Sequence, residues 1–431
     1  MNDIDKKVLE YKDELFESLS RLISIPSKEG NPEENSPFGI YPKLALEEAL
    51  KISRELGFKT KNIDNAIGYA EYGDGKDYVG ILGHVDVVPE GDGWDYPPFE
   101  LTVTEDKLYG RGILDNKGPI IGCLYAMKII KDLKLPISKS IRVIFGTNEE
   151  SGFKDIPYYL KSEKEAASGF TPDCKYPAVY GERGILDITI LSDNIENPSI
   201  AEISGNFRSS NVPDLAKVEL LTKEVIEENG VTAPGNAPEM GQNAMVKLCK
   251  TLTEKNLLKG TEKEFIKFVY ETFYENHTLE KIGVNCKDSI SGSLMVNPYK
   301  LSFENGRLGL SLVFRYPISY KYEDMVDIIN KLLPTGGKFN INRRMDSVCF
   351  DKDSPMLKVM KEAYEEVTGL DGTPVTTTGG TYAKVFPNIV AYGPSFPGQK
   401  GIGHNKNEYM DIEDLLTNIK IYTRAIYGLA K

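Results

Sequence analysis

Near the amino terminus, apolar residues recur at the three- and four-residue intervals of an amphipathic helix. This spacing predicts one helix at residues 4–22 and a second at 43–56. Short apolar stretches at 68–72 and 78–82 predict strands, and the next helical pattern lies at 118–133. The chain therefore begins with helices and strands that alternate along the sequence.

A run of β-branched and aromatic residues at 141–145 predicts a strand that is buried on both sides. Strands of this kind need helices over both faces of their sheet. We therefore predict that residues 1–183 belong to an α/β domain, with a mixed sheet and helices on both faces.

After residue 183 the pattern changes. Apolar and polar residues alternate at 185–191, as in a half-exposed antiparallel strand, and Asn305-Gly306 separates two more alternating runs, which predicts a hairpin. Further elements predicted here are helices at 213–228, 241–258, 262–274 and 324–333 and a strand at 338–343. This segment therefore predicts an α+β domain.

The carboxyl-terminal residues return to the earlier pattern, with helices predicted at 356–368 and 412–429. No internal repeat or long linker separates the segments. We therefore expect one discontinuous α/β domain, formed by residues 1–183 and 351–431, which is interrupted by an α+β lid domain at 184–350.

Composition limits the class of protein. The 431 residues are 40% hydrophobic and 27% charged, which suits a packed core, and their number suits two or three domains of about 150 residues. With 52 basic and 64 acidic residues, the net charge of −12 disfavours nucleic acid and anionic membranes as partners. The amino terminus lacks the apolar core of a signal peptide, and no run approaches the ~18 apolar residues of a membrane span. The five cysteines form no C-x-x-C pair, so we expect reduced thiols and a cytoplasmic protein.

Only three histidines are available to a metal or acid–base site: His84, His277 and His404. His84 follows the apolar stretch at 78–82, and Asp86 lies on the same side of an extended chain. A carboxylate at that position can accept a hydrogen bond from the second ring nitrogen of a metal-bound histidine. The alternative is an ordinary histidine at a strand end whose ring is satisfied by a neighbouring aspartate.

Several acidic residues also lie at predicted strand ends or in loops. Asp115 precedes a predicted helix, and Glu149 and Glu150 follow a buried strand, where α/β proteins usually bind ligands. Asp173 and His404 lie in loops, and each of these groups alone could be a solvated surface residue. Two imidazoles with several carboxylates suit Zn²⁺, Mn²⁺ or Co²⁺, and the number of groups favours two ions.

Eight motifs follow one another between about residues 80 and 410: GHVDVVPEG, GRGILDNKGP, NEESG, TPDCKYP, GNFRSSNVPD, RYP, TTTGGTYAKVFPN and FPGQKGIGHNKNEY. Together they resemble the co-catalytic metallopeptidases of the ArgE, DapE, aminoacylase and carboxypeptidase G type, and most closely the PepV-like Xaa-His dipeptidases. The resemblance covers nearly the whole chain. It implies a hydrolase with two divalent metal ions, Zn²⁺ first and Mn²⁺ or Co²⁺ as alternatives.

The resemblance also implies a set of metal ligands. His84 would bind one ion and His404 the other, with Asp115 as the bridge between them. Glu150 and Asp173 would complete the two coordination spheres.

Two further acidic residues take catalytic roles by the same resemblance. Asp86 would orient His84, and Glu149 would be the general base that takes a proton from a water bridging the two ions. The family also places a cis peptide after the bridging aspartate, which here is the Asp115–Asn116 bond.

The resemblance also implies four residues that bind substrate, two of which lie in the lid. Arg315 would hold the substrate carboxylate, Asn211 would make a polar contact, and the loop with Gly379 and Gly380 would approach the substrate with its backbone. The alternatives are an ordinary salt bridge for Arg315 and a helix cap for Asn211.

One motif departs from the family pattern. The family reads Ser-Ala-His-Gly where this chain reads TAPG, so Pro234 replaces an imidazole that helps to polarise the scissile carbonyl. Loss of one such donor lowers turnover by roughly 10²–10³ in other oxyanion holes. His277 is a remote substitute, and we expect it to be an exposed residue at a helix end.

The sequence as a whole predicts a cytoplasmic, monomeric metallo-dipeptidase that acts on small peptides with a free C-terminal carboxylate. The enlarged lid would supply what a second subunit supplies in dimeric relatives. One alternative is a deacylase or carboxypeptidase that acts on an N-acyl amino acid. Another is a metal-binding relative whose turnover is reduced by Pro234, and a third makes the carboxylates a solvated rim without metal.

Overall fold

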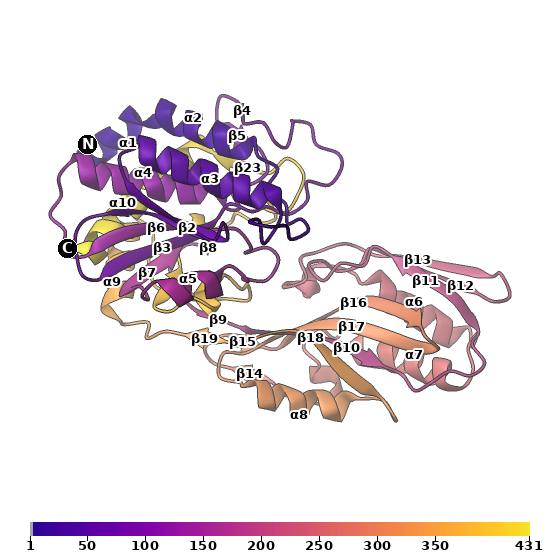
Figure 1. Ribbon diagram of the computed structural model, residues 1–431. Helices are drawn as coiled ribbons and strands as arrows, with labels where there is room; N and C mark the ends of the chain where they lie inside the picture. Colours follow the sequence, from indigo (N-terminus) through magenta and orange to yellow (C-terminus); the bar gives the residue numbers. More distant parts are fainter. Residues whose placement is uncertain (1–2) are drawn as a thin grey trace. The chain divides into compact units, whose positions relative to one another are not determined.

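The computed structural model describes residues 3–431, which form two units (Figure 1). The α/β unit contains the residues up to Tyr180 together with Phe350–Val375 and Thr381–Lys431. The inserted unit contains Gly181–Cys349 and the short segment Thr376–Gly380.

The α/β unit is built on a mixed sheet. Its strands follow the order β1 (Lys59–Ile63), β2 (Ile67–Tyr72), β6 (Ser140–Gly146), β3 (Tyr78–His84), β7 (Ser168–Thr171), β21 (Ile389–Ala391) and β9 (Val179–Glu182). Strand β3 pairs in parallel with β6 and β7, whereas β1, β2 and β6 are antiparallel neighbours. Every residue of β3 is buried, as expected of a central strand that is covered on both faces.

Shorter strands complete the pairing. Strands β19 (Val348–Cys349) and β20 (Val375–Thr377) pair with β9, and β22 (Pro394–Ser395) pairs with β8 (Cys174–Lys175). A separate small sheet has the order β23 (Tyr409–Asp411), β5 (Lys107–Tyr109) and β4 (Thr102–Val103).

Helices cover both faces of the mixed sheet. Neighbouring residues of β2 point to opposite sides: Gly68 lies against Leu46 of α3 (Ile40–Glu55), whereas the Tyr69 ring lies 6.0 Å from Tyr159 of α5 (Ile156–Ser162). The other helices of this unit are α1 (Asp3–Glu10), α2 (Lys12–Ile23), α4 (Lys117–Asp132), α9 (Pro355–Thr368), α10 (Ile412–Ala430) and the 3₁₀ turn Tyr382–Lys384. The predicted α/β fold class with an inserted domain is confirmed.

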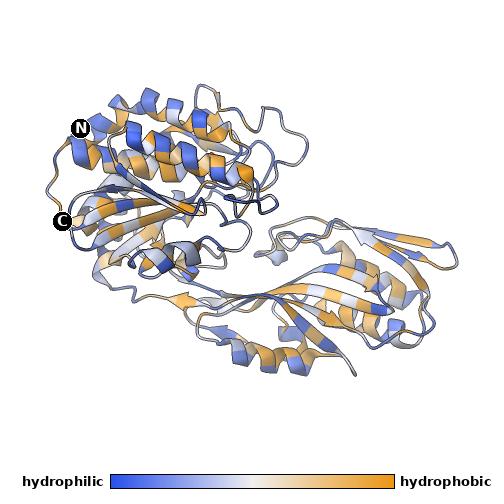
Figure 2. Cartoon of the chain, in the orientation of Figure 1, coloured by the Kyte–Doolittle hydropathy of each residue, from blue (hydrophilic) through white to orange (hydrophobic). Residues whose placement is uncertain are grey.

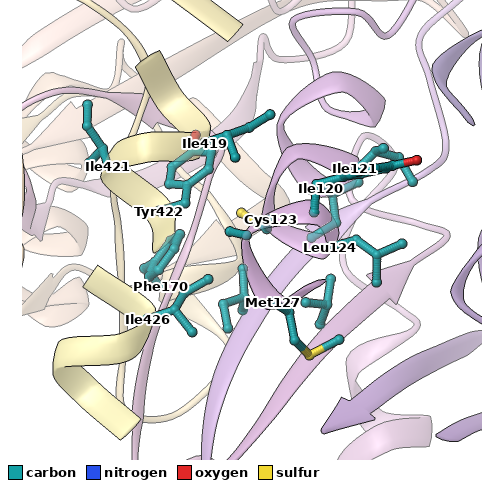
Figure 3. Packing of buried hydrophobic residues seen from close by; sticks show 14 of the residues in the cluster. Ile120, Ile121, Cys123, Leu124, Met127, Phe170, Ile419, Ile421, Tyr422 and Ile426 are labelled. Carbon is teal, nitrogen blue, oxygen red and sulfur yellow. The ribbon is translucent and has the colours of Figure 1, made fainter. Parts of the chain in front are cut away.

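Within the larger core, apolar residues of α4, α10 and β7 pack against one another (Figure 3). Phe170 of β7 stacks on Tyr422 of α10 with the ring centroids 5.5 Å apart. Figure 2 shows the central strands as mainly apolar and the outer helices as alternately apolar and polar, which is the pattern that predicted them. Among the described residues 3–431, every helix is too short or too polar to cross a lipid bilayer.

The inserted unit has a four-stranded antiparallel sheet with its own apolar core. The strand order is β16 (Met295–Glu304), β17 (Arg307–Tyr316), β10 (Gly184–Leu191) and β18 (Lys338–Met345). The hairpin predicted at Asn305-Gly306 is confirmed, because these residues join β16 to β17. The other elements of this unit are β11 (Ile200–Gly205), β12 (Leu215–Leu220), β13 (Val225–Asn229), β14 (Lys287–Asp288), β15 (Gly292–Ser293), α6 (Ala244–Glu254), α7 (Gly260–Phe273), α8 (Tyr322–Leu332) and the 3₁₀ turns Pro238–Met240 and Glu280–Ile282.

Two predicted helices differ in the structure. The helix predicted at 213–228 is wrong, because this segment forms the antiparallel pair β12 and β13. Ala216, Val218 and Leu220 are buried and alternate with more exposed residues. This two-residue period, together with pairing to β11, makes the segment a strand rather than a helix. The single helix predicted at 4–22 is two helices, which are separated at Tyr11.

Candidate metal centre

The parallel pairing of β3 and β6 brings the first candidate residues together. His84 is the last residue of β3 and lies opposite Gly146, the last residue of β6. The loop that carries Glu149 and Glu150 begins directly after β6. Carboxyl ends of neighbouring parallel strands meet at one edge of a sheet, so these side chains lie at the same edge.

Two loops and the residues before β8 supply the remaining groups. Asp115 precedes α4, Asp173 precedes β8, and His404 lies in the loop before β23. The Nε2 atom of His84 lies 3.1 Å from Oδ1 of Asp115 and 3.7 Å from Oδ2 of Asp173. The Nε2 atom of His404 lies 3.0 Å from Oδ2 of Asp115 and 3.1 Å from Oε1 of Glu150. The two carboxylate oxygens of Asp115 therefore face two different imidazoles.

Asp86 connects the ends of two strands. The backbone amides of Glu149 and Glu150 donate to Oδ1 and Oδ2 of Asp86, each at 3.2 Å. The Nδ1 atom of His84 lies 3.4 Å from Oδ1 of Asp86 but only 2.9 Å from its backbone oxygen. The side chain of Asp86 therefore holds the glutamate loop, and its main chain provides the closer acceptor for the His84 ring.

The donor set fits divalent cations. His84, Glu149 and Asp173 offer three ligand atoms that lie within 4.8 Å of one another, and His84, Asp115 and Glu150 offer a second such group. Imidazole nitrogens with carboxylate oxygens are the ligands that Zn²⁺, Mn²⁺ and Co²⁺ bind.

The electrostatics of the cluster favour a cation. Burial raises the pKa of Glu149 well above its usual range, and the nearby Asp173 carboxylate adds to the effect. Burial, together with Asp115, raises the pKa of Asp173 to about 6. Partial desolvation opposes the charged form of His404, whose side chain is 48% exposed, but the carboxylates of Asp115 and Glu150 outweigh it and raise its pKa to about 12. Carboxyl groups that resist ionisation here lie beside imidazoles that carry a proton. Divalent ions that bind at this site would replace these protons.

Three buried residues whose side chains the sequence interpretation gave no role support this site. The peptide between Asp115 and Asn116 is cis, as the motif resemblance implied. The Asn116 side chain donates to the Pro172 carbonyl at 2.6 Å and accepts from the His84 amide at 3.3 Å. Glu408 and Arg111 form a fully buried ion pair behind Asp115. The only sequence signal for Glu408 was its place four residues after His404.

The predicted lid residues lie in the inserted unit. Arg315 lies in β17, where its Nη1 donates to the Thr378 carbonyl at 3.1 Å and its buried Nε has no partner among residues 3–431. Burial and the nearby Arg343 lower the pKa of Arg315 to about 10. No salt bridge to Arg315 occurs within residues 3–431, so the alternative of an ordinary ion pair does not hold. Gly379 and Gly380 belong to this unit through the segment Thr376–Gly380.

Asn211 lies outside the helices, so the alternative of a helix cap does not hold. It forms an isolated antiparallel bridge with Pro234, its carbonyl accepts from the Asn297 side chain at 3.1 Å, and its Oδ1 accepts from Ser210 at 2.6 Å. Pro234 is exposed and offers no N–H donor.

His277 and Trp94 make hydrogen bonds and packing contacts within the fold. His277 follows α7 and is half-buried rather than exposed, and burial lowers its pKa. It lies in the inserted unit, and its carbonyl accepts from the Val296 amide. Trp94 packs against its own loop: Nε1 donates to the Glu90 carbonyl at 2.8 Å, and the ring lies 5.1 Å from the Arg111 guanidinium. All five cysteines are free thiols.

Comparison with known proteins supplies a family and a fold. The sequence model of Peptidase family M20/M25/M40 matches residues 80–428. A protein of Staphylococcus epidermidis named "Putative dipeptidase" is 34% identical over 465 residues, which cover 98% of this chain and 98% of the relative. The solved structure of human carnosine dipeptidase 1 has a TM-score of 0.64 at 15% identity and covers 99% of this chain and 98% of its own. The Bacillus subtilis YXEP protein, described as a dinuclear metal-binding peptidase of the M20 family, has a TM-score of 0.55 at 10% identity over 97% and 98% of the two chains.

Proposed function

The chain belongs to peptidase family M20/M25/M40 and is therefore a metallopeptidase, and we propose that it hydrolyses the amide bond of dipeptides with a free C-terminal carboxylate. The observation that carries this proposal is the arrangement of Asp115, whose two oxygens lie 3.1 and 3.0 Å from the Nε2 atoms of His84 and His404. A carboxylate that faces two imidazoles is suited to be shared by a pair of divalent ions. The dipeptidase name of the Staphylococcus epidermidis relative supports the substrate class.

The donor set suits two ions, of which Zn²⁺ is the first choice and Mn²⁺ or Co²⁺ the alternatives. His84 and Asp173 would hold one ion, His404 and Glu150 the other, and Asp115 would be shared. When bound, such a pair polarises a carbonyl and lowers the pKa of a water between the ions.

Glu149 would be the general base. Its raised pKa suits a carboxylate that must accept a proton and then release it. In the proposed step, Glu149 takes one proton from the attacking water as the water oxygen bonds to the carbonyl carbon. It then gives that proton to the amide nitrogen as the carbon–nitrogen bond breaks. The products are a carboxylic acid and an amine, and no further reactant is required.

Arg315 is the group that would bind the free carboxylate of the substrate. Its buried Nε has no partner, and the guanidinium has no salt bridge within residues 3–431. A planar guanidinium can donate two parallel hydrogen bonds to a carboxylate. Asn211 and the loop with Gly379 and Gly380 would contact the polar backbone of the same substrate.

Substrate comparison tests the proposal. Protein treated with EDTA and then reconstituted with Zn²⁺ or Mn²⁺ is assayed on a dipeptide, on the same dipeptide with an amidated C-terminus, and on an N-acetyl amino acid. We expect cleavage of the dipeptide, a loss of about tenfold or more on amidation, and no turnover without metal. Faster cleavage of the N-acetyl amino acid would support the alternative of a deacylase. No cleavage by protein that holds two ions would reject the proposal and support a metal-binding relative without turnover.

A further inference from the structure

Glu408 is a fully buried carboxylate that collects four donors. One oxygen, Oε1, accepts from the backbone amides of Gly112 at 3.1 Å, Leu114 at 2.9 Å and Asp115 at 3.0 Å. The other, Oε2, accepts from Nη1 of Arg111 at 2.6 Å. The turn before Asp115 is therefore wrapped around a single side chain.

Strand pairing explains how Glu408 reaches this turn. Tyr409 of β23 pairs with Tyr109 of β5, so the residue before β23 lies beside the residue after β5. The Gly110 amide donates to the backbone oxygen of Glu408 at 3.1 Å, which continues that pairing. The side chain of Glu408 then turns inward to the amides that follow. Because His404 lies only four residues earlier, this one carboxylate joins the segment of one imidazole to the segment of the shared aspartate.

Arg111 extends the connection to a third segment. Its Nη2 donates to the carbonyls of Glu90 at 3.2 Å and Pro89 at 3.4 Å, in the loop that follows His84. The Trp94 ring stacks near the guanidinium from the same loop. The pair of Glu408 and Arg111 thus contacts the segments that carry both imidazoles and the aspartate between them.

We propose that Glu408 is a positioning residue for the metal centre, with Arg111 as its counterion, and that it sets the separation of Asp115 from His84 and His404. The inference rests on the two-metal site of the proposed function. A buried charge is retained at a cost in desolvation, so four donors and a counterion indicate that this carboxylate is structurally required. Residues that support metal ligands in this way typically change metal affinity by about 10–100-fold when they are replaced.

The chain offers a matched control for Glu408. Glu262 in α7 is also fully buried and accepts the backbone amides of Ser199 at 2.8 Å and Ile200 at 3.1 Å, but it lies in the inserted unit. Glu408→Gln and Glu262→Gln each neutralise one buried carboxylate that accepts backbone amides. Only the first would disturb the metal centre.

The test measures Zn²⁺ binding to metal-free protein by titration calorimetry, without substrate, together with hydrogen exchange of the amides at 112–115. For Glu408→Gln we expect about 10–100-fold weaker binding of at least one Zn²⁺ and faster exchange of those amides. For Glu262→Gln we expect two Zn²⁺ bound with affinities within about twofold of wild type. Wild-type Zn²⁺ affinity in Glu408→Gln, or an equal loss in Glu262→Gln, would overturn the proposal.

A second variant covers the case in which Glu408→Gln does not fold. Arg111→Lys keeps a cation for the carboxylate but cannot reproduce the fork toward the carbonyls of Pro89 and Glu90. We expect weaker Zn²⁺ binding here as well, and unchanged binding would overturn the proposal. Dipeptide turnover is measured separately, so wild-type protein that binds two Zn²⁺ but cleaves no dipeptide would refute only the proposed function.

Discussion

Replacement of Asp86 by alanine is expected to damage the glutamate loop more than the orientation of His84. The Asp86 side chain accepts the backbone amides of Glu149 and Glu150 at 3.2 Å each, and alanine would leave both donors without it. The closest acceptor for the His84 ring is the backbone oxygen of Asp86 at 2.9 Å, which alanine retains. The loss should therefore be felt first by the general base and only second by the metal-binding histidine.

The magnitude follows from the number of donors left without a partner. A buried donor without its partner costs about 1–3 kcal/mol, so two donors, one of them half-exposed, cost about 2–4 kcal/mol. That is a large share of the roughly 5–15 kcal/mol by which a folded protein is stable. Asp86→Asn retains one acceptor and should cost about half as much.

Two measurements on Asp86→Ala check this reasoning. Urea denaturation of the metal-free protein should show the lower free energy of unfolding, and steady-state kinetics should show a larger loss in kcat than in Zn²⁺ affinity, because Glu149 is displaced while His84 keeps its main-chain hydrogen bond. A variant within about 0.5 kcal/mol of wild type would refute the assigned hydrogen bonds. Loss of Zn²⁺ binding with kcat unchanged at saturating metal would refute the order of effects.

Four further outcomes follow from the site. Glu149→Gln should lower kcat by about 10²–10⁴ while two Zn²⁺ remain bound, and loss of the metals instead would make Glu149 a ligand rather than the base. Arg315→Ala should raise KM for a dipeptide by about 10–100-fold, because one charged hydrogen bond contributes roughly 1.5–3 kcal/mol, and should leave an amidated dipeptide nearly unaffected. Between pH 6 and 8, Zn²⁺ affinity should rise about tenfold per pH unit for each proton that metal binding releases. His404 must lose a proton to bind metal, because Asp115 and Glu150 raise its pKa to about 12. Calorimetry that shows no pH dependence of Zn²⁺ affinity would contradict this. Pro234→His should increase kcat by up to about 10²–10³ if the wild type lacks a donor to the scissile carbonyl, and an unchanged kcat would show that another group supplies it.

The strongest sequence patterns predicted buried elements. The continuous apolar run at 141–145 and the helical period at 118–133 correspond to β6 and α4, because residues buried on most sides must be apolar whatever packs against them. The segment 213–228 was wrongly predicted as a helix. The spacing of its apolar residues fits both a helix and a strand, and the pairing of β12 with β11 and β13 selects the strand.

For the candidate site, too, part was predicted from sequence patterns and part depends on the folded chain. The local pattern predicted that His84, Glu149 and Glu150 follow strands, and the parallel pairing of β3 with β6 then brings these strand ends to one edge of the sheet. Asp115 and His404 became candidates through their motifs, but only the folded chain places both oxygens of Asp115 against two imidazoles.

Glu408 and Arg111 owe their contacts to the tertiary fold. In the sequence they are two charged residues in polar segments almost 300 positions apart, which is the usual pattern of solvated loops. In the structure the β5–β23 pairing brings them together and buries both, so their charges and N–H groups must satisfy one another. Which groups can bind metal follows from the amino-acid sequence, because it depends on residue type. Which charges are buried, and which backbone amides they hold, depends on contacts between distant segments, and these contacts exist only in the folded chain.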